Sequence, residues 1–202
     1  MEFRRKLNNI QRRFAMKKKM DFIFGMLFAL GTIIFIVLFL TNDAFFTWAF
    51  ARHHNILSWY IRPLFIIPMV IFAFKKSYTG IFASIFALFT SMFWFPVPAS
   101  TNPQVLEFLA FEMAYLKEPW TAPKIVMSLA VPLFFFMLLT AAWRRNWKWL
   151  LGVIIGAAVL KIIWSVAFSG KAGMSILKPA LLGLVACIVG LSFYYKKYKL
   201  KS

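Results

Sequence analysis

Three ionisable side chains lie within or beside strongly apolar segments, and their types define a possible chemistry: Arg62, Glu112 and Lys161. An arginine and a lysine attract an anion, and a carboxylate between them acts as a counter-ion or exchanges a proton. Ionisable groups in apolar segments are costly, and they usually face a partner or a cavity. These residues predict a binding site for an anionic solute or a lipid headgroup, with Glu107 as a further candidate residue.

Each residue also has a structural interpretation that involves no ligand. The alkyl chains of Arg62 and Lys161 are long enough for their charged groups to reach the membrane surface. Glu112 can form an ion pair with either cation that merely joins two helices, because a lone buried carboxylate is expensive. Both interpretations remain open from the sequence.

Two adjacent histidines, His53 and His54, offer a different chemistry. With Glu107 or Glu112 they could ligate a metal, and with Glu112 they could act as acid or base in catalysis. However, zinc-binding helices place two histidines four residues apart, whereas adjacent residues point in different directions. The single cysteine, Cys187, allows neither a disulfide nor a cysteine metal site. We therefore predict no metal site and no cofactor.

The composition is that of a membrane protein. Of the 202 residues, 62% are hydrophobic and 19% aromatic, and the mean hydropathy is +0.75. The net charge of +18 comes from 24 Lys and Arg residues against six acids. These basic residues fall mainly between apolar runs, so they predict orientation in a bilayer and attraction to anionic lipid, not nucleic-acid binding.

Six apolar runs predict an all-α bundle of about six transmembrane helices. A helix needs about 20 residues to cross about 30 Å of hydrocarbon, and each run is close to that length. Together the runs define a transmembrane region, 20–195, between a basic N-terminal segment, 1–19, and a basic tail, 196–202. The predicted spans are residues 22–40, 57–74, 80–95, 125–143, 149–168 and 179–195, of which 80–95 is the shortest.

Basic residues collect on one side of the predicted spans. They lie in 1–19, at Lys75 and Lys76, in the connection between the fourth and fifth spans, and in 196–202. By the positive-inside rule this side is cytoplasmic, so both termini face the cytoplasm, and we expect a bacterial plasma membrane. Residues 1–19 form either an amphipathic helix on the membrane surface or a disordered tail.

The connection 96–124 contains the element that must position Glu112. Pro103 and Pro119 supply the start and stop of a helix over residues 104–118. At 100° per residue, Glu107 and Glu118 fall on one face of this helix, whereas Glu112 falls on the apolar face. We predict an amphipathic helix on the extracytoplasmic side that turns Glu112 toward the bundle.

Arg62 and Lys161 are placed at depths that Glu112 could reach. Arg62 is about five residues into its span, or roughly 8 Å from the outer end at 1.5 Å per residue. Lys161 is about twelve residues into a span that runs outward, so it lies beyond the midplane. In the same span, Gly152 and Gly156 form a GxxxG motif, which is typical of close helix packing within a bundle or between protomers.

Four short motifs resemble the pattern of uncharacterised small bacterial integral membrane proteins. The resemblance covers about the middle two thirds of the chain and implies no known activity. The motifs are Trp94-Phe95-Pro96-x-Pro98, Phe108-Leu109-x-x-Glu112, Pro119-Trp120-Thr121 and Lys161-x-x-Trp164-Ser165.

Three function classes remain open from the sequence. The first is a small transporter or permease with an outward site for an anionic solute or lipid headgroup. The second is a membrane-embedded enzyme that acts on a lipid or isoprenoid headgroup. The third is an accessory subunit without a site of its own, which would use the face of Gly152 and Gly156 to join a complex.

Overall fold

The structure, a computed structural model, describes residues 2–200 and contains helices joined by short connections, with no strand in that range. Lys201, part of the predicted basic tail, lies outside the described residues. The helices are α1 (Glu2–Thr41), α2 (Asp43–His53), α3 (Leu57–Ile61), η1 (Arg62–Phe65), α4 (Ile66–Phe74), α5 (Tyr78–Thr90), η2 (Ser91–Phe93), α6 (Pro103–Lys117), α7 (Ala122–Ser128), α8 (Ala130–Trp143), α9 (Trp147–Ser169), η3 (Gly170–Ile176) and α10 (Leu177–Lys199).

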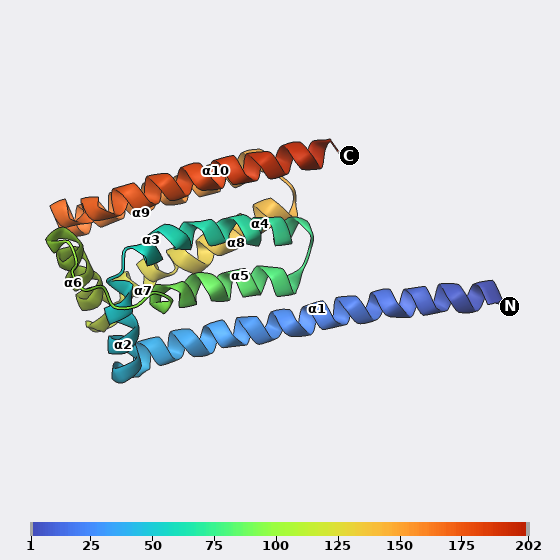
Figure 1. Ribbon diagram of the computed structural model, residues 1–202, viewed down its shortest axis with the longest axis horizontal. Coiled ribbons are helices and arrows are strands. Elements are labelled where there is room, and N and C mark those ends of the chain that lie inside the picture. Colours follow the sequence, from blue (N-terminus) through green and yellow to red (C-terminus); the bar gives the residue numbers. More distant parts are fainter. Residues whose placement is uncertain (1, 201–202) are drawn as a thin grey trace.

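Several helices are long and apolar enough to cross a membrane. Four stretches meet this criterion by length and composition: Phe3–Thr41, Leu57–Phe74, Ala122–Trp143 and Trp147–Lys199. The last contains α9 and α10, which run side by side in opposite directions (Figure 1). Tyr78–Phe93 is apolar but shorter. The predicted all-α class is confirmed, whereas the number of crossings stays a prediction.

The long helices form a bundle with two different ends (Figure 1). Both described ends of the chain lie at one end, which we call the terminal end, together with the connections that contain Lys75 and Arg144. Helices α2 and α6 lie across the opposite end, which we call the α6 end. Helix α6 spans Pro103–Lys117, where the prediction places residues 104–118. The basic connections therefore lie at the opposite end of the bundle from α6, and the orientation in a membrane stays a prediction.

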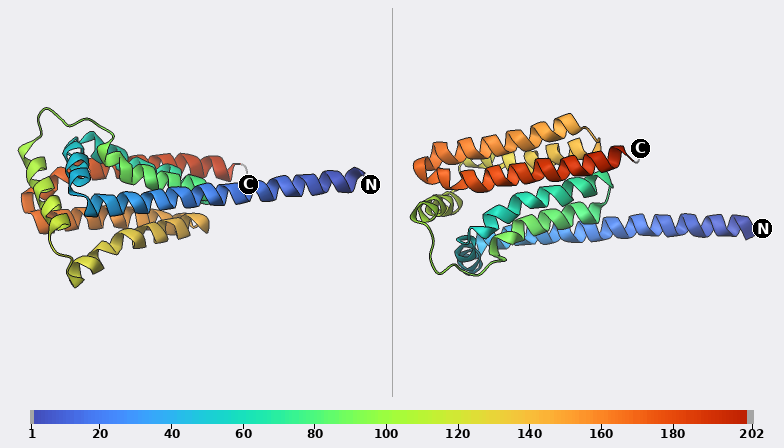
Figure 2. Two further views of the ribbon diagram at one scale, coloured as in Figure 1. Left: turned by 90° about the horizontal axis from the view of Figure 1, so that it is seen from below. Right: turned by 45° about the horizontal axis from the view of Figure 1, so that its top comes forward.

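Helix α1 is one continuous helix, so no helix end separates residues 1–19 from the first predicted span. Its N-terminal part extends beyond the rest of the bundle (Figure 2). Phe3, Ile10 and Phe14 are exposed there. The residues between Phe14 and Phe22 are good helix formers apart from Asp21, and no glycine or proline interrupts them, so the helix has no local reason to stop.

Helix α1 is joined to the start of α5 by Asp21. Its carboxylate accepts hydrogen bonds from Ser77 Oγ, at 2.7 Å, and from the Tyr78 backbone N–H, at 2.8 Å. Gly25 permits the close approach, because a Cβ there would lie 2.8 Å from the Tyr78 backbone. The carboxylate thus satisfies N–H groups that a helix start leaves without partners.

The second predicted span is not a uniform helix. It consists of α3, the 3₁₀ segment η1 and α4, and Pro63 lies at the start of η1. Proline lacks an N–H and crowds the preceding turn, which explains the break. Helix α10 packs against it: Cys187 Sγ donates a hydrogen bond to the Pro63 carbonyl at 3.2 Å, and a Cβ on Gly183 would lie 2.5 Å from the Pro63 ring. This contact fixes the backbone that begins at Arg62.

The GxxxG motif of α9 is not used for packing among the described residues. A Cβ on Gly152 or Gly156 would meet no atom within 4 Å. Of the two uses predicted for this motif, packing within the bundle is therefore not observed, and contact between protomers stays a prediction.

Candidate functional site

Four ionisable side chains from four elements meet at the α6 end, and we call them the charged cluster: His53, Arg62, Glu112 and Lys161. Lys161 Nζ lies 3.4 Å from Glu112 Oε1, and His53 Nε2 lies 3.8 Å from Glu112 Oε2. Arg62 Nη1 lies 3.5 Å from His53 Nε2. The structure thus brings together the three residues predicted to form an anion site. It also places His53, predicted separately as a metal ligand or as an acid or base, beside Glu112.

Local packing of α2 turns His53 inward. Asn42 caps α2 by accepting a hydrogen bond from the Phe45 N–H, and Phe46, Phe50 and His53 then follow at spacings of four and three residues on the buried face. The His53 ring lies 5.9 Å from the Phe50 ring, and His53 is only 4% exposed. The spacing is that of one helical face, so the aromatic core holds the imidazole in place.

The hydrogen bonds of Ser58 determine where the proton lies on neutral His53. Ser58 Oγ donates its only hydrogen to the Asn55 carbonyl at 2.8 Å. Its contact with His53 Nδ1, at 3.0 Å, must therefore be a bond that Nδ1–H donates. Nε2 is then without hydrogen and accepts from Arg62 Nη1. We assign the Nδ1–H tautomer from this network.

His53 is neutral at pH 7. Burial lowers the pKa of His53 well below its usual value of 6.5, and the positive charge of Arg62 lowers it further, as do His54 and Lys161. A charged imidazole would lose its hydration there without full compensation.

The pair of Lys161 and Glu112 is partly open to solvent. The lysine side chain is 46% exposed and the carboxylate side chain 22% exposed. Lys161 Nζ also lies 5.0 Å from the Trp164 ring centre and 5.7 Å from that of Phe108. Ion pairs of this exposure contribute about 0–1 kcal/mol, so Lys161 remains available to another anion.

Two buried polar atoms near the cluster lack hydrogen-bond partners among the described residues. These atoms are Arg62 Nε and Ser165 Oγ. Ser165 lies one helical turn after Lys161 on α9 and is fully buried. A buried polar group without a partner costs about 1–3 kcal/mol, so a hydrogen bond to either atom would stabilise the protein.

Two predicted site residues lie outside the cluster. Glu107 is on the exposed face of α6. His54 packs on the Phe50 ring, at 6.0 Å between ring centres, and lines a hollow that no cluster residue lines. Among the described residues, no group of three or more His, Cys, Asp or Glu side chains gathers as a metal site would require.

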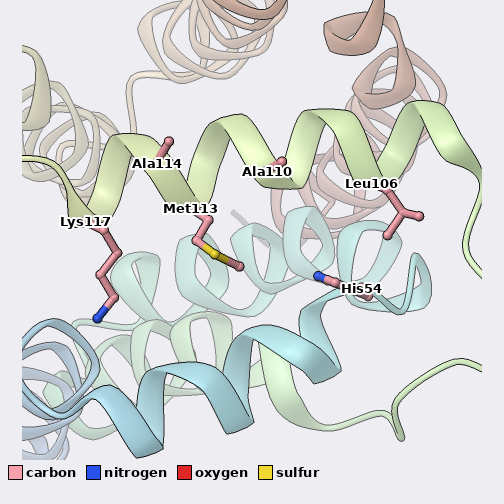
Figure 3. Close-up of a pocket in the computed structure, with 6 residues that line it drawn as sticks. All are labelled: His54, Leu106, Ala110, Met113, Ala114 and Lys117. Atoms are coloured by element: carbon pink, nitrogen blue, oxygen red, sulfur yellow. The ribbon is translucent and has the colours of Figure 1, made fainter.

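The hollow next to His54 is apolar and lies between α6 and the end of α2 (Figure 3). Its volume is about 470 Å³. Leu106, Met113 and Lys117 extend from α6 on the side that faces His54. Lys117 forms an ion pair with Asp43 of α2 and closes one end of the hollow. None of the four cluster residues lines the hollow, but His54 and Met113, which do, directly follow His53 and Glu112 in the sequence.

Sequence reasoning overlooked Ser58, named Ser165 only as part of a motif, and considered His53 as a metal ligand or as a catalytic acid or base. The one local signal was the five-residue spacing from His53 to Ser58, which spans the turn between α2 and α3.

The chain matches no family model, no curated protein and no solved structure.

Proposed function

We propose that this chain is an integral membrane protein that binds the anionic headgroup of a lipid-like molecule at its α6 end. Arg62 and Lys161 would contact the anion, and Glu112 would be their counter-ion. The observation that carries this proposal is the buried Arg62 Nε, a charged donor without a hydrogen-bond partner among the described residues. A bound phosphate oxygen would satisfy it, since arginine binds phosphate with two parallel N–H groups.

The charge of the cluster supports an anion with one negative charge. Arg62 and Lys161 carry one positive charge each and Glu112 one negative charge, so one positive charge remains while His53 is neutral. A phosphodiester carries one negative charge and would neutralise it. Uncompensated charge at the edge of a low-dielectric region attracts its counter-ion strongly.

The hollow supports a lipid-like ligand over a small solute. Leu106, Ala110 and Met113 give it an apolar wall, and Met113 directly follows Glu112 of the charged cluster in the sequence. Ligand pockets typically combine such walls with a few polar groups that fix orientation. In this proposal the α6 end faces away from the cytoplasm of a bacterial plasma membrane, because the basic connections lie at the terminal end.

The break in the second span supports a transport role. Arg62 is the first residue of the 3₁₀ segment η1, where the helix is interrupted. In many transporters the substrate site is formed by interrupted helices, whose parts can move relative to each other. We therefore propose a small transporter or permease for an anionic lipid-like molecule.

A membrane-embedded enzyme is the second candidate, and the distance of 3.8 Å from His53 Nε2 to Glu112 Oε2 favours it. A carboxylate and an imidazole at this separation could act together as acid and base. Glu112→Gln distinguishes the two roles. It should strengthen anion binding if Glu112 is a counter-ion, and it should abolish turnover without strengthening binding if Glu112 is catalytic.

The direct test is a binding measurement with a short-chain phosphodiester lipid. We expect the purified full-length protein to bind dihexanoyl-phosphatidylglycerol more tightly than the zwitterionic dihexanoyl-phosphatidylcholine in isothermal titration. Lys161→Gln should weaken phosphatidylglycerol binding about tenfold, the effect of one charge-assisted contact of about 1.4 kcal/mol.

Lys171→Gln is the matched control. It removes the same charge from an exposed position in η3, also at the α6 end, and should leave the affinity unchanged. Equal binding of the two lipids, or equal losses in the two lysine variants, would refute the proposed site.

A further inference from the structure

We infer that His53 is the proton-binding residue that controls the anion site, so that one proton enters the site together with the anion. In this inference the proton on Nε2 decides whether Arg62 is held by His53 or is free to bind the anion. The inference rests on the proposed function, because it assigns a coupled proton to the same site.

The Nε2 atom of His53 lies between Arg62, which needs a hydrogen-bond acceptor, and Glu112, which needs a donor. His53 Nε2 lies 3.5 Å from Arg62 Nη1, a donor, and 3.8 Å from Glu112 Oε2, an acceptor. Without a proton Nε2 can only accept, and with a proton it can only donate. The two contacts are therefore mutually exclusive, and the protonation state selects between them.

The neutral state keeps Arg62 occupied. Ser58 Oγ accepts a hydrogen bond from Nδ1–H, so Nε2 carries the lone pair and accepts a hydrogen bond from Arg62 Nη1. The ring cannot turn to present another edge, because it is buried between Phe50 and Trp59. Arg62 then has one donor fewer for an incoming anion.

The protonated state releases Arg62. A proton on Nε2 repels the guanidinium and can be donated to Glu112, which partly neutralises the carboxylate. The charge of the cluster rises by one unit, and Nη1 of Arg62 becomes available for the anion in addition to Nε, which has no partner in either state. Affinity for an anion is therefore expected to be higher when His53 carries the proton.

The charged groups around His53 make its protonation depend on whether an anion is bound. Among the described residues, four charged or titratable groups face His53: Arg62 from η1, Lys161 from α9, Glu112 from α6 and His54, which directly follows α2. The two fixed cations oppose protonation, and a bound anion would offset them. If a bound anion raises the affinity of His53 for a proton, then a bound proton must raise the affinity of the site for the anion by the same factor.

Histidine NMR of the unmodified protein tests this coupling directly. The chain contains two histidines, His53 and His54, so selective labelling gives two titrating signals, and His54→Gln assigns them. We expect dihexanoyl-phosphatidylglycerol to raise the pKa of His53. If binding of the lipid leaves the His53 titration unchanged, the inference is wrong.

The pH dependence of binding is the second test. The phosphodiester keeps one negative charge between about pH 8 and about pH 5, where histidine titrates, so a change in affinity reports on the protein. We expect affinity to rise about tenfold on acidification, equivalent to a pKa shift of about one unit. His53→Gln retains an acceptor for Arg62 without a titrating proton, and should remove this dependence.

The outcomes separate the two proposals. Binding that strengthens at low pH in the parent protein but not in His53→Gln supports the inference. Binding with the same affinity at both pH values refutes the inference and leaves the proposed function standing. No binding at either pH refutes the proposed function and the inference with it.

Discussion

His53 is the residue on which the arrangement of the α6 end depends. Both ring nitrogens and the backbone carbonyl are engaged: Nδ1 with Ser58, Nε2 with Arg62, and the carbonyl with Trp59 Nε1 at 3.1 Å. A buried polar group whose hydrogen-bond partners are all present favours one arrangement of the surrounding side chains, because any other arrangement leaves a buried donor or acceptor without a partner. Arg62 Nε is the exception in the cluster, and it is the group for which we propose a ligand.

Replacing Ser58 by alanine tests this network. Ser58→Ala leaves the buried His53 Nδ1–H without an acceptor, which should cost about 1–3 kcal/mol of stability. We expect a lower midpoint in thermal unfolding monitored by circular dichroism. Ser100→Ala removes a hydroxyl from an exposed connection and should change stability by less than about 0.5 kcal/mol. Equal effects of the two changes would show that the network contributes nothing.

At the scale of elements, α10 holds the broken second span in its observed shape. Gly183 approaches the Pro63 ring, and Cys187, one turn later, donates to the Pro63 carbonyl. Both residues face η1, so α10 supports the backbone that carries Arg62. Proline breaks the hydrogen-bond ladder, and the thiol satisfies one of the carbonyls that remain.

Two glycine-to-alanine changes separate packing from helix propensity. Gly183→Ala places a methyl group against Pro63 and should destabilise the protein by about 1–3 kcal/mol, as overpacking does. Gly152→Ala adds the same methyl group where no atom lies within 4 Å, and it should be neutral or slightly stabilising. Thermal unfolding of the two variants side by side measures the difference.

A destabilising effect of Gly152→Ala would show that the open face of α9 makes a contact outside this chain. If this change lowers stability or the mass of the purified particle, the open face of α9 is covered by another protomer or protein. That outcome would favour the accessory-subunit alternative for this surface.

At the scale of the molecule, the distribution of charged residues predicts the orientation of the protein in the membrane. Basic connections and both ends of the chain lie at the terminal end, whereas Glu107, Glu112 and both histidines lie at the α6 end (Figure 1). Positively charged loops are retained on the cytoplasmic side during insertion. The anion site would then face outward.

Labelling with a membrane-impermeant maleimide in intact cells tests this orientation. In a Cys187→Ser background, which keeps a donor toward Pro63, we expect Glu107→Cys to be labelled from outside. Arg144→Cys, exposed at the terminal end, should react only after the cells are opened. The reverse pattern would place the charged cluster in the cytoplasm and contradict the proposed function.

The sequence by itself determined the membrane class and much of the local structure. Hydropathy and helical periodicity are properties of short windows, so the apolar spans and the helix between Pro103 and Pro119 could be predicted without knowledge of packing. The same periodicity placed Glu112 on the inward face of α6 and Glu107 on the exposed face, and the structure has them there.

Only the tertiary structure decided which residues share a site. His53, Arg62, Glu112 and Lys161 come from four helical elements, and their distances depend on how those helices pack. No local pattern distinguishes a histidine that packs against Trp59 from one at the membrane surface. The same reason applies to the open face of Gly152, because a GxxxG motif does not specify its partner. Contacts between distant segments are set by packing, which is a property of the whole chain and not of any window in it.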